Sequence, residues 1–220
     1  MKELIKFWLF QIAWIGVSCL LFGIAVAHCE PVDALIPYII KAHDSKVAQK
    51  ITKIRAAEYA NQIVLSATTW GVPLDYAVGF LEWESDGFQN TIDKQGSGSK
   101  VLNVRQWCFG LGKLKVSTAN DFSRTVLGWS GYISGRDLIY DYRMNIDLSI
   151  AYLAWCIDYK RGNLRRGLNA YRAGPTGEKN GNYRIKVKYP WGVSETRDYS
   201  DWVMDCVDRW KRWEARNGND

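Results

Sequence analysis

From residue 45 onward, apolar residues recur at the three- and four-residue spacing that is typical of amphipathic helices. A first helix is predicted from Ser45 to Gly71, where the glycine ends it. A second is predicted from Pro73, a residue well suited to a first helical turn, to about Ser85. A third helix is predicted over residues 117–126, and a fourth from residue 145, with an apolar face over residues 146–157. A fifth, short helix is predicted to end at the breaker at residues 174–175, and a final helix to begin near residue 195.

The remaining segments carry few strand signals. Residues 30–44 contain two prolines and are expected to form a lead-in, while residues 89–107, 128–143 and 176–194 are expected to be loops or irregular. Residues 183–188 alternate between apolar and polar side chains, which allows one small β-hairpin. The expected fold class is therefore mainly α, in a single domain.

The first 27 residues indicate export. Two lysines precede an apolar run over residues 7–27, and the run ends in Ala25-Val26-Ala27, a sequence of the kind that signal peptidase cleaves. The run is also long enough to span a bilayer, so a retained anchor in the inner membrane is the alternative. Either interpretation places the rest of the chain in the periplasm or cell envelope.

Export changes the interpretation of the cysteines. Cys29, Cys108, Cys156 and Cys206 follow the apolar run, and an even number of cysteines in an oxidising compartment makes two disulfides plausible, with at least one expected. The alternative is that some are free, buried thiols.

The composition narrows the function. The chain of 220 residues has 29 Lys and Arg against 23 Asp and Glu, a net charge of +6. This excess suits an anionic polymer such as cell wall, or a lipid surface, and the scattered basic residues do not favour nucleic acid. Two histidines, no C-x-x-C pair and no P-loop predict neither a metal site nor a cofactor.

Two glutamates lie near the end of the second predicted helix. Glu82 and Glu84 point to nearly opposite sides of it, and Glu84 ends the apolar stripe while Glu82 falls outside. Partial desolvation at the rim of a core would raise the pKa of Glu84, so that it could act as a general acid. The alternative is a structural carboxylate, paired with a nearby Arg or Lys or exposed at the helix end.

Several short motifs in a fixed order resemble those of the soluble lytic transglycosylases, the goose-lysozyme-like glycoside hydrolase family 23. The resemblance spans residues 60–205, about two-thirds of the chain. The motifs are Glu84-Ser85, Gly110-Leu111-Gly112-Lys113-Leu114 with Ser117-Thr118-Ala119, Asn145-Ile146, Ala151-Tyr152-Leu153, Ala170-Tyr171-Arg172-Ala173-Gly174-Pro175, and Pro190 with Glu195-Thr196-Arg197 and Tyr199.

The resemblance implies a single lysozyme-like (goose-type) helical catalytic domain, over residues 45–220, that cuts the glycan strands of peptidoglycan as a monomer. In that family one glutamate, here Glu84, protonates the oxygen between N-acetylmuramic acid and N-acetylglucosamine. It then takes the proton of the muramyl 6-hydroxyl, which closes on C1 to give a 1,6-anhydro end. This single-acid scheme differs from the usual pair of carboxylates in glycosidases.

The same resemblance implies supporting roles. Ser85 would hold the glutamate or the sugar, and Gly110 and Leu111 would let backbone groups approach the glycan. Other residues of the motifs would form hydrogen bonds, contact the substrate or support the glycan-binding groove. They are Lys113, Tyr171, Arg172, Glu195 and Tyr199. Among the tryptophans, only Trp107 and Trp191 are candidates for sugar stacking.

The sequence also departs from the family pattern. Lys113 replaces the usual glutamine and Arg172 the usual asparagine, and a cation close to Glu84 would lower its pKa. The spacing from Glu84 to Phe88 is one residue longer than usual. A hydrolytic muramidase and a degenerate protein that only binds the cell wall therefore stay open as alternatives.

Overall fold

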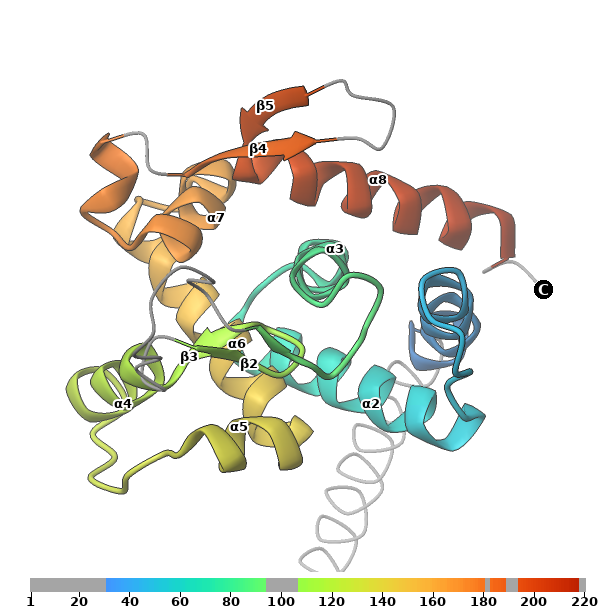
Figure 1. Ribbon diagram of the computed structural model, residues 1–220, viewed down its shortest axis with the longest axis horizontal. Coiled ribbons are helices and arrows are strands. Elements are labelled where there is room, and N and C mark those ends of the chain that lie inside the picture. The colour runs from blue at the N-terminus through green and yellow to red at the C-terminus, as the bar shows by residue number, and fades with distance from the viewer. Residues whose placement is uncertain (1–30, 94–106, 181–182, 189–193, 218–220) are drawn as a thin grey trace, which may run out of the picture.

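The computed structural model describes residues 31–93, 107–180, 183–188 and 194–217, which form seven named α-helices, a further helical stretch over residues 31–44 and two small antiparallel sheets (Figure 1). The prediction of a mainly α fold with a small hairpin is confirmed. The helices are α2 (Lys53–Trp70), α3 (Leu74–Glu84), α4 (Val116–Thr125), α5 (Gly135–Tyr140), α6 (Tyr142–Tyr159), α7 (Leu164–Ala173) and α8 (Tyr199–Asn217), with the 3-10 turn η2 (Gly177–Asn180) after α7.

Helix α3 is the centre of the molecule, with α8 along one side of it and α2 along another (Figure 1). Its residues from Ala77 to Glu82 are all buried, so it has no solvent-exposed face over this stretch. A Cβ on Gly79 would lie 2.5 Å from Cγ2 of Val207, so only glycine lets α8 approach this closely.

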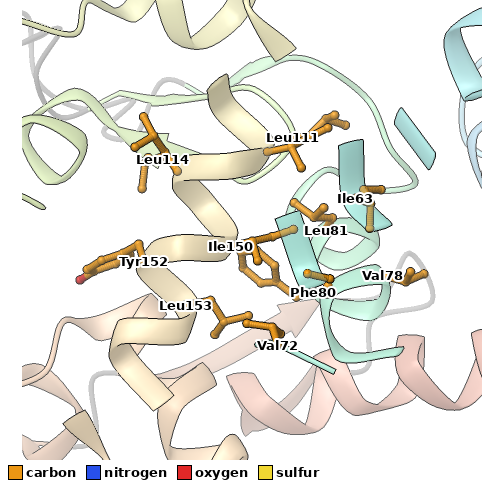
Figure 2. Close-up of a cluster of buried hydrophobic side chains, with 14 of the residues drawn as sticks. Ile63, Val72, Val78, Phe80, Leu81, Leu111, Leu114, Ile150, Tyr152 and Leu153 are labelled. Atoms are coloured by element: carbon orange, nitrogen blue, oxygen red, sulfur yellow. The ribbon is translucent and has the colours of Figure 1, made fainter. Parts of the chain in front are cut away.

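The apolar core joins α2, α3 and α6. Figure 2 shows Ile63 of α2, Phe80 and Leu81 of α3, and Ile150 and Leu153 of α6 gathered in one cluster, and each is 0% exposed. Full burial of each such side chain stabilises the fold by roughly 1.5–3 kcal/mol. This packing fixes the axis of α3 and therefore the position of its C-terminal end.

Helix starts were predicted less accurately than helix ends. Gly71 ends α2 in the left-handed conformation at φ 66°, as expected, but α2 begins at Lys53 rather than at Ser45, because the Thr52 side chain accepts a hydrogen bond from the backbone N–H of Arg55. Likewise the helix expected from residue 145 begins at residue 142 and the one expected from residue 117 at residue 116.

Two helical segments were missed. The lead-in expected over residues 30–44 is helical over residues 31–44, and it packs Leu35, Tyr38 and Ile39, at i, i+3 and i+4, into the core. A proline inside a helix costs about 3 kcal/mol, and burial of these three side chains offsets the cost of Pro37. The irregular stretch expected over 128–143 contains α5, whose start is fixed by the Ser134 capping box.

The strands form two separate sheets. The first pairs β1 (Ile92–Asp93) with β2 (Cys108–Phe109) and β2 with β3 (Leu114–Lys115), and the second pairs β4 (Arg184–Lys188) with β5 (Ser194–Asp198), all antiparallel. The final helix was therefore predicted to start too early, because Glu195 lies in β5, paired with Val187.

Two disulfides, which the sequence made plausible with at least one expected, are contradicted, because neither Cys156 nor Cys206 forms a bridge. Cys156 and Cys206 are free thiols on the buried faces of α6 and α8, where they pack as small apolar side chains. Burial raises the pKa of each thiol to about 12. Cys108 is also buried, and Cys29 lies outside the described residues.

Among the described residues, none of the helices is both long enough and apolar enough to cross a membrane. The apolar run over residues 7–27 lies outside them, so signal cleavage and anchoring both stay predictions.

Candidate active site

Glu84 is the last residue of α3, where the chain leaves the helix through a tight turn. The Ser85 hydroxyl, 1% exposed, donates to the Leu81 carbonyl at 2.5 Å and accepts from the Phe88 N–H at 2.7 Å. Asp86 and Phe88 have φ values of 49° and 62°, in the left-handed region. Ser85 therefore holds the backbone beside Glu84, and these left-handed residues accommodate the longer spacing to Phe88.

A cavity of about 410 Å³ opens beside Glu84, between the β2–β3 hairpin, α4, α6 and the end of α7. Glu84 is the only acidic residue among the described residues that line it. The other lining residues are Cys108, Lys113, Leu114, Lys115, Thr118, Tyr152, Tyr171, Arg172, Ala173 and Gly174. One carboxylate thus faces several cations and hydroxyl groups.

Tyr199, the first residue of α8, holds the Glu84 carboxylate. Its hydroxyl donates a hydrogen bond of 2.5 Å to Oε1 of Glu84, and the tyrosine is 1% exposed. Burial raises the pKa of Tyr199 well above its usual value, and the charge of Glu84 raises it further, so Tyr199 stays a hydrogen-bond donor at any physiological pH. The bond fixes one oxygen of the carboxyl group and orients the group at the cavity.

Tyr171 forms part of the cavity wall. Its hydroxyl donates to the carbonyl of Gly112 at 2.7 Å, and its ring packs edge-on against Phe80 at 4.6 Å. Burial, and then the nearby charge of Glu84, raise the pKa of Tyr171 well above its usual value. A Cβ on Gly112 would lie only 1.9 Å from the Ser149 hydroxyl oxygen, so this position requires glycine.

The loop of Gly110, Leu111 and Gly112 is fastened to α6 by one side chain. Asn145, which is fully buried, donates to the Phe109 carbonyl at 2.9 Å and accepts from the Gly112 N–H at 2.9 Å. A Cβ on Gly110 would clash with the Asn145 amide at 2.3 Å, and Leu111 points into the core with 0% exposure. Neither Gly110 nor Leu111 lines the cavity. The place of Gly110 in the motif follows from close packing against Asn145, and that of Leu111 from its burial in the core.

The two unusual cations differ in their surroundings. Both Lys113 and Arg172 line the cavity with Glu84. The Lys113 ammonium group donates to the carbonyl oxygen of Thr91 at 3.2 Å and also to the Thr91 hydroxyl, whereas Arg172 is exposed. Lys113 is therefore tied to the loop beside β1.

The other sequence candidates lie away from the cavity lining. Glu195 lies on β5, where its carboxylate is 3.6 Å from the Arg197 guanidinium, and Trp107 packs at 6.2 Å from the Phe109 ring. Trp191 lies outside the described residues. The structure therefore brings Glu84, Lys113, Tyr171, Arg172 and Tyr199 together.

Sequence reasoning missed several lining residues, although most lie inside the motifs. Thr118 belongs to the Ser117-Thr118-Ala119 block, and Tyr152 to the Ala151-Tyr152-Leu153 block. Their position in these blocks was the available signal. Lys115 follows the glycine loop and adds a third cation.

The expected placement of Glu82 outside the buried face is wrong. Glu82 is 8% exposed, accepts a 2.6 Å hydrogen bond from the Tyr38 hydroxyl, and pairs with Arg209 at 2.9 Å. An apolar stripe on one side of the helix did not predict which residues are buried, because residues 77–82 of α3 are buried on every side. Glu82 is thus a buried carboxylate paired with an arginine across the interface between α3 and α8.

A buried ion cluster supports the wall formed by the end of α7. Glu178 of η2 accepts from Lys160 at 2.8 Å and from Arg166 at 2.9 Å, and Lys160 also donates to the Pro175 carbonyl at 3.0 Å. Hydrogen bonds from Arg166 and Lys160 lower the pKa of Glu178 to about 2. The cluster fixes the turn that follows Gly174.

Within the described part of the chain, no group of three His, Cys, Asp or Glu residues could hold a metal ion. No family model matches the chain, and no curated protein matches it.

One solved structure similar to this chain is an inactive mutant of the lytic transglycosylase Slt from Pseudomonas aeruginosa. The two are 17% identical, with a TM-score of 0.48 over 74% of this chain and 27% of that one. This chain thus spans about a quarter of the length of that enzyme.

Proposed function

We propose that this protein is an exported peptidoglycan lytic transglycosylase with Glu84 as its sole general acid and base. One observation carries the proposal: Glu84 is the only acid among the described residues that line the cavity, and Tyr199 orients its carboxyl group. A single carboxylate suits a mechanism in which no second one acts as nucleophile or activates water. The motif order in the sequence supports the same conclusion.

In the proposed reaction, protonated Glu84 gives its proton to the oxygen that links C1 of N-acetylmuramic acid to N-acetylglucosamine. The bond between C1 and this oxygen breaks, and N-acetylglucosamine leaves with a free 4-hydroxyl. The Glu84 carboxylate then takes the proton of the muramyl 6-hydroxyl, whose oxygen bonds to C1. The product is a 1,6-anhydro end, no water is consumed, and Glu84 returns to its protonated state.

The charges of the cavity fit this substrate. Lys113, Lys115 and Arg172 line it with a single carboxylate, which leaves a net positive charge. Peptidoglycan carries carboxylates on its peptide stems, so the cavity attracts the polymer. Asp86 does not compete for the catalytic role, since it is exposed and pairs with Lys46 at 3.2 Å.

The same cations favour a second candidate, a protein that binds the cell wall without cutting it. A cation close to Glu84 would stabilise its ionised form and weaken it as an acid. A hydrolytic muramidase with the same fold is the third candidate, and it differs by the addition of water to C1.

Mass spectrometry of the fragments that the purified protein releases from peptidoglycan distinguishes these functions. We expect muropeptides with 1,6-anhydro-muramic ends from the wild type and none from Glu84→Gln. The matched control is Glu214→Gln, an exposed glutamate on α8, which should release the same fragments as the wild type.

Fragments heavier by one water would identify a muramidase. A folded wild-type protein that sediments with the wall but releases nothing would support the binding protein. An active Glu84→Gln variant would overturn the assignment of Glu84.

A further inference from the structure

A second cavity, of about 560 Å³, lies on the other side of α3. It is bounded by the helix over residues 31–44, the end of α3 and α8. The helix over residues 31–44 lies near the C-terminal part of α8 in Figure 1. Glu82 and Trp83 line this cavity, whereas Glu84 lines the first one. Its volume falls in the range of small-ligand sites. We refer to it as the basic cavity.

The acids of the basic cavity are already neutralised. Glu82 pairs with Arg209 at 2.9 Å, and Asp205 pairs at 2.7 Å with Arg197, which lies outside the lining. Neither carboxylate is therefore available to balance the other cations.

Three lining cations have no acidic partner among the described residues. Lys41, Arg212 and Arg216 lie more than 4.0 Å from any described carboxylate oxygen, and Lys41 instead lies over the Trp213 ring at 4.6 Å. Arg212 and Arg216 are four residues apart on α8, so they project from the same face of the helix. The cavity thus has a surplus of positive charge that an anionic ligand would balance.

The walls between these cations are aromatic. Trp83 stacks on Trp202 at 5.3 Å with an 8° angle between the rings, and Trp213 lies 6.0 Å from Tyr38. The indole N–H groups of Trp202 and Trp213 have no acceptor in the described part of the chain. Buried donors without an acceptor are unfavourable, and oxygen atoms of a bound ligand are the groups that would satisfy them after a small adjustment of the rings.

We propose that the basic cavity binds a phosphate group, carried by an anionic phospholipid headgroup or by a small soluble phosphate ester. The guanidinium group of an arginine can donate two parallel hydrogen bonds to the oxygens of one phosphate. The aromatic walls accommodate the apolar part of an ester. Lys41 follows the end of the apolar run at Ala27 by 14 residues in the sequence.

Isothermal titration calorimetry on the full chain in a neutral detergent tests the proposal. The probes are mixed micelles with phosphatidylglycerol or phosphatidylcholine, glycerol 3-phosphate, and tri-glutamate at equal ionic strength. We expect phosphatidylglycerol to bind, and the double variant Arg212→Gln/Arg216→Gln to bind it at least about tenfold more weakly. Both arginines are exposed, so their replacement should leave the melting temperature unchanged.

The matched control is Lys53→Gln/Arg124→Gln, which removes two exposed positive charges outside both cavities and should bind like the wild type. Binding of phosphatidylglycerol alone identifies a headgroup site, and equal binding of glycerol 3-phosphate identifies a site for soluble esters. No binding, equal binding of tri-glutamate or phosphatidylcholine, or an equal loss in the control variant would overturn the proposal. The readout is independent of glycan cleavage.

Discussion

The hydroxyl of Tyr199 and the carboxylate of Glu84 form a 2.5 Å hydrogen bond, although 115 positions separate them in the chain. The bond joins the first residue of α8 to the last residue of α3. The orientation of the Glu84 carboxyl group therefore depends on how α3 and α8 pack.

Replacement of Tyr199 by phenylalanine removes this donor and keeps the ring. A hydrogen bond to a charged group contributes about 1.5–3 kcal/mol, so we expect glycan cleavage to fall roughly tenfold to a hundredfold. The carboxylate form of Glu84 loses a hydrogen bond, and the protonated form is the proposed acid, so the alkaline limb of the pH–rate profile should move to higher pH. Tyr140→Phe, at a residue 79% exposed, is the control and should leave both measurements unchanged. An unaltered pH profile in Tyr199→Phe would contradict this role.

The Glu178 cluster makes stability depend on pH. Because the folded-state pKa is lowered from 4.5 to about 2, the ionised form of Glu178 stabilises the fold above pH 4.5, and this contribution is lost as the pH falls toward 2. We expect Glu178→Gln to lower the unfolding free energy at pH 7 by about 2 kcal/mol, since Arg166 is half-exposed and its contribution is screened.

Urea denaturation of wild type and Glu178→Gln at pH 7, 4 and 2.5 measures this difference, which should shrink toward acid. Glu214→Gln, at an exposed position, should show no such trend. A difference that stayed constant with pH would contradict the contribution of ionised Glu178.

Gly112 should not tolerate a side chain. In Gly112→Ala the new methyl group would lie 1.9 Å from the Ser149 hydroxyl oxygen, so the loop beneath the cavity must shift. Overpacking of this kind costs about 1–3 kcal/mol, which thermal unfolding would detect. Gly162→Ala is the comparison, because nothing lies within 4 Å of its Cβ and only its φ of 76° causes strain. Equal destabilisation by the two changes would show that the clash is relieved.

The exposed Arg172 should contribute to attachment to the cell wall rather than to stability. Arg172→Asn removes one of three cations from the cavity, so we expect weaker sedimentation with purified peptidoglycan at low salt and an unchanged melting temperature. The difference should disappear near 1 M salt, where the Debye length is about 3 Å. Arg124→Asn, on the exposed face of α4, should sediment like the wild type. A difference that persists in high salt would mean that Arg172 contributes through direct contacts with the cell wall rather than through its charge.

Cys156 and Cys206 should resist thiol reagents in the native protein. Both are buried, with pKa values of about 12, so little thiolate forms at pH 7. Maleimide labelling followed by peptide mass mapping should find both unmodified in native protein and both modified in urea. A disulfide-linked peptide that contains either residue would contradict the packing described above.

Helix ends could be predicted from the sequence because local residues determine them. Gly71 adopts the left-handed conformation that ends α2, and the break after α7 falls at Gly174. The helix over residues 31–44 could not be predicted from local signals, since Pro37 argues against it and only burial of Leu35 and Ile39 against distant helices offsets that cost.

The candidate site could be predicted only in part, because local motifs identify its residues but long-range contacts determine their surroundings. The motifs indicate Glu84, but the environment of a carboxylate depends on contacts between distant segments. Glu82 was expected outside the buried face, and its actual partners, Tyr38 and Arg209, lie 44 and 127 positions away in the sequence. The bond from Tyr199 to Glu84 depends on long-range packing in the same way.

Glu82 and Glu84 together connect α3 to two points of α8, Arg209 and Tyr199. Ten residues separate these two points, about 15 Å along the helix. Two attachment points so far apart prevent α8 from both sliding and pivoting: a shift of one residue, about 1.5 Å, would stretch the Tyr199 bond beyond hydrogen-bonding range. The longest named helix thus holds the proposed catalytic carboxyl group in one orientation through contacts at two separate points.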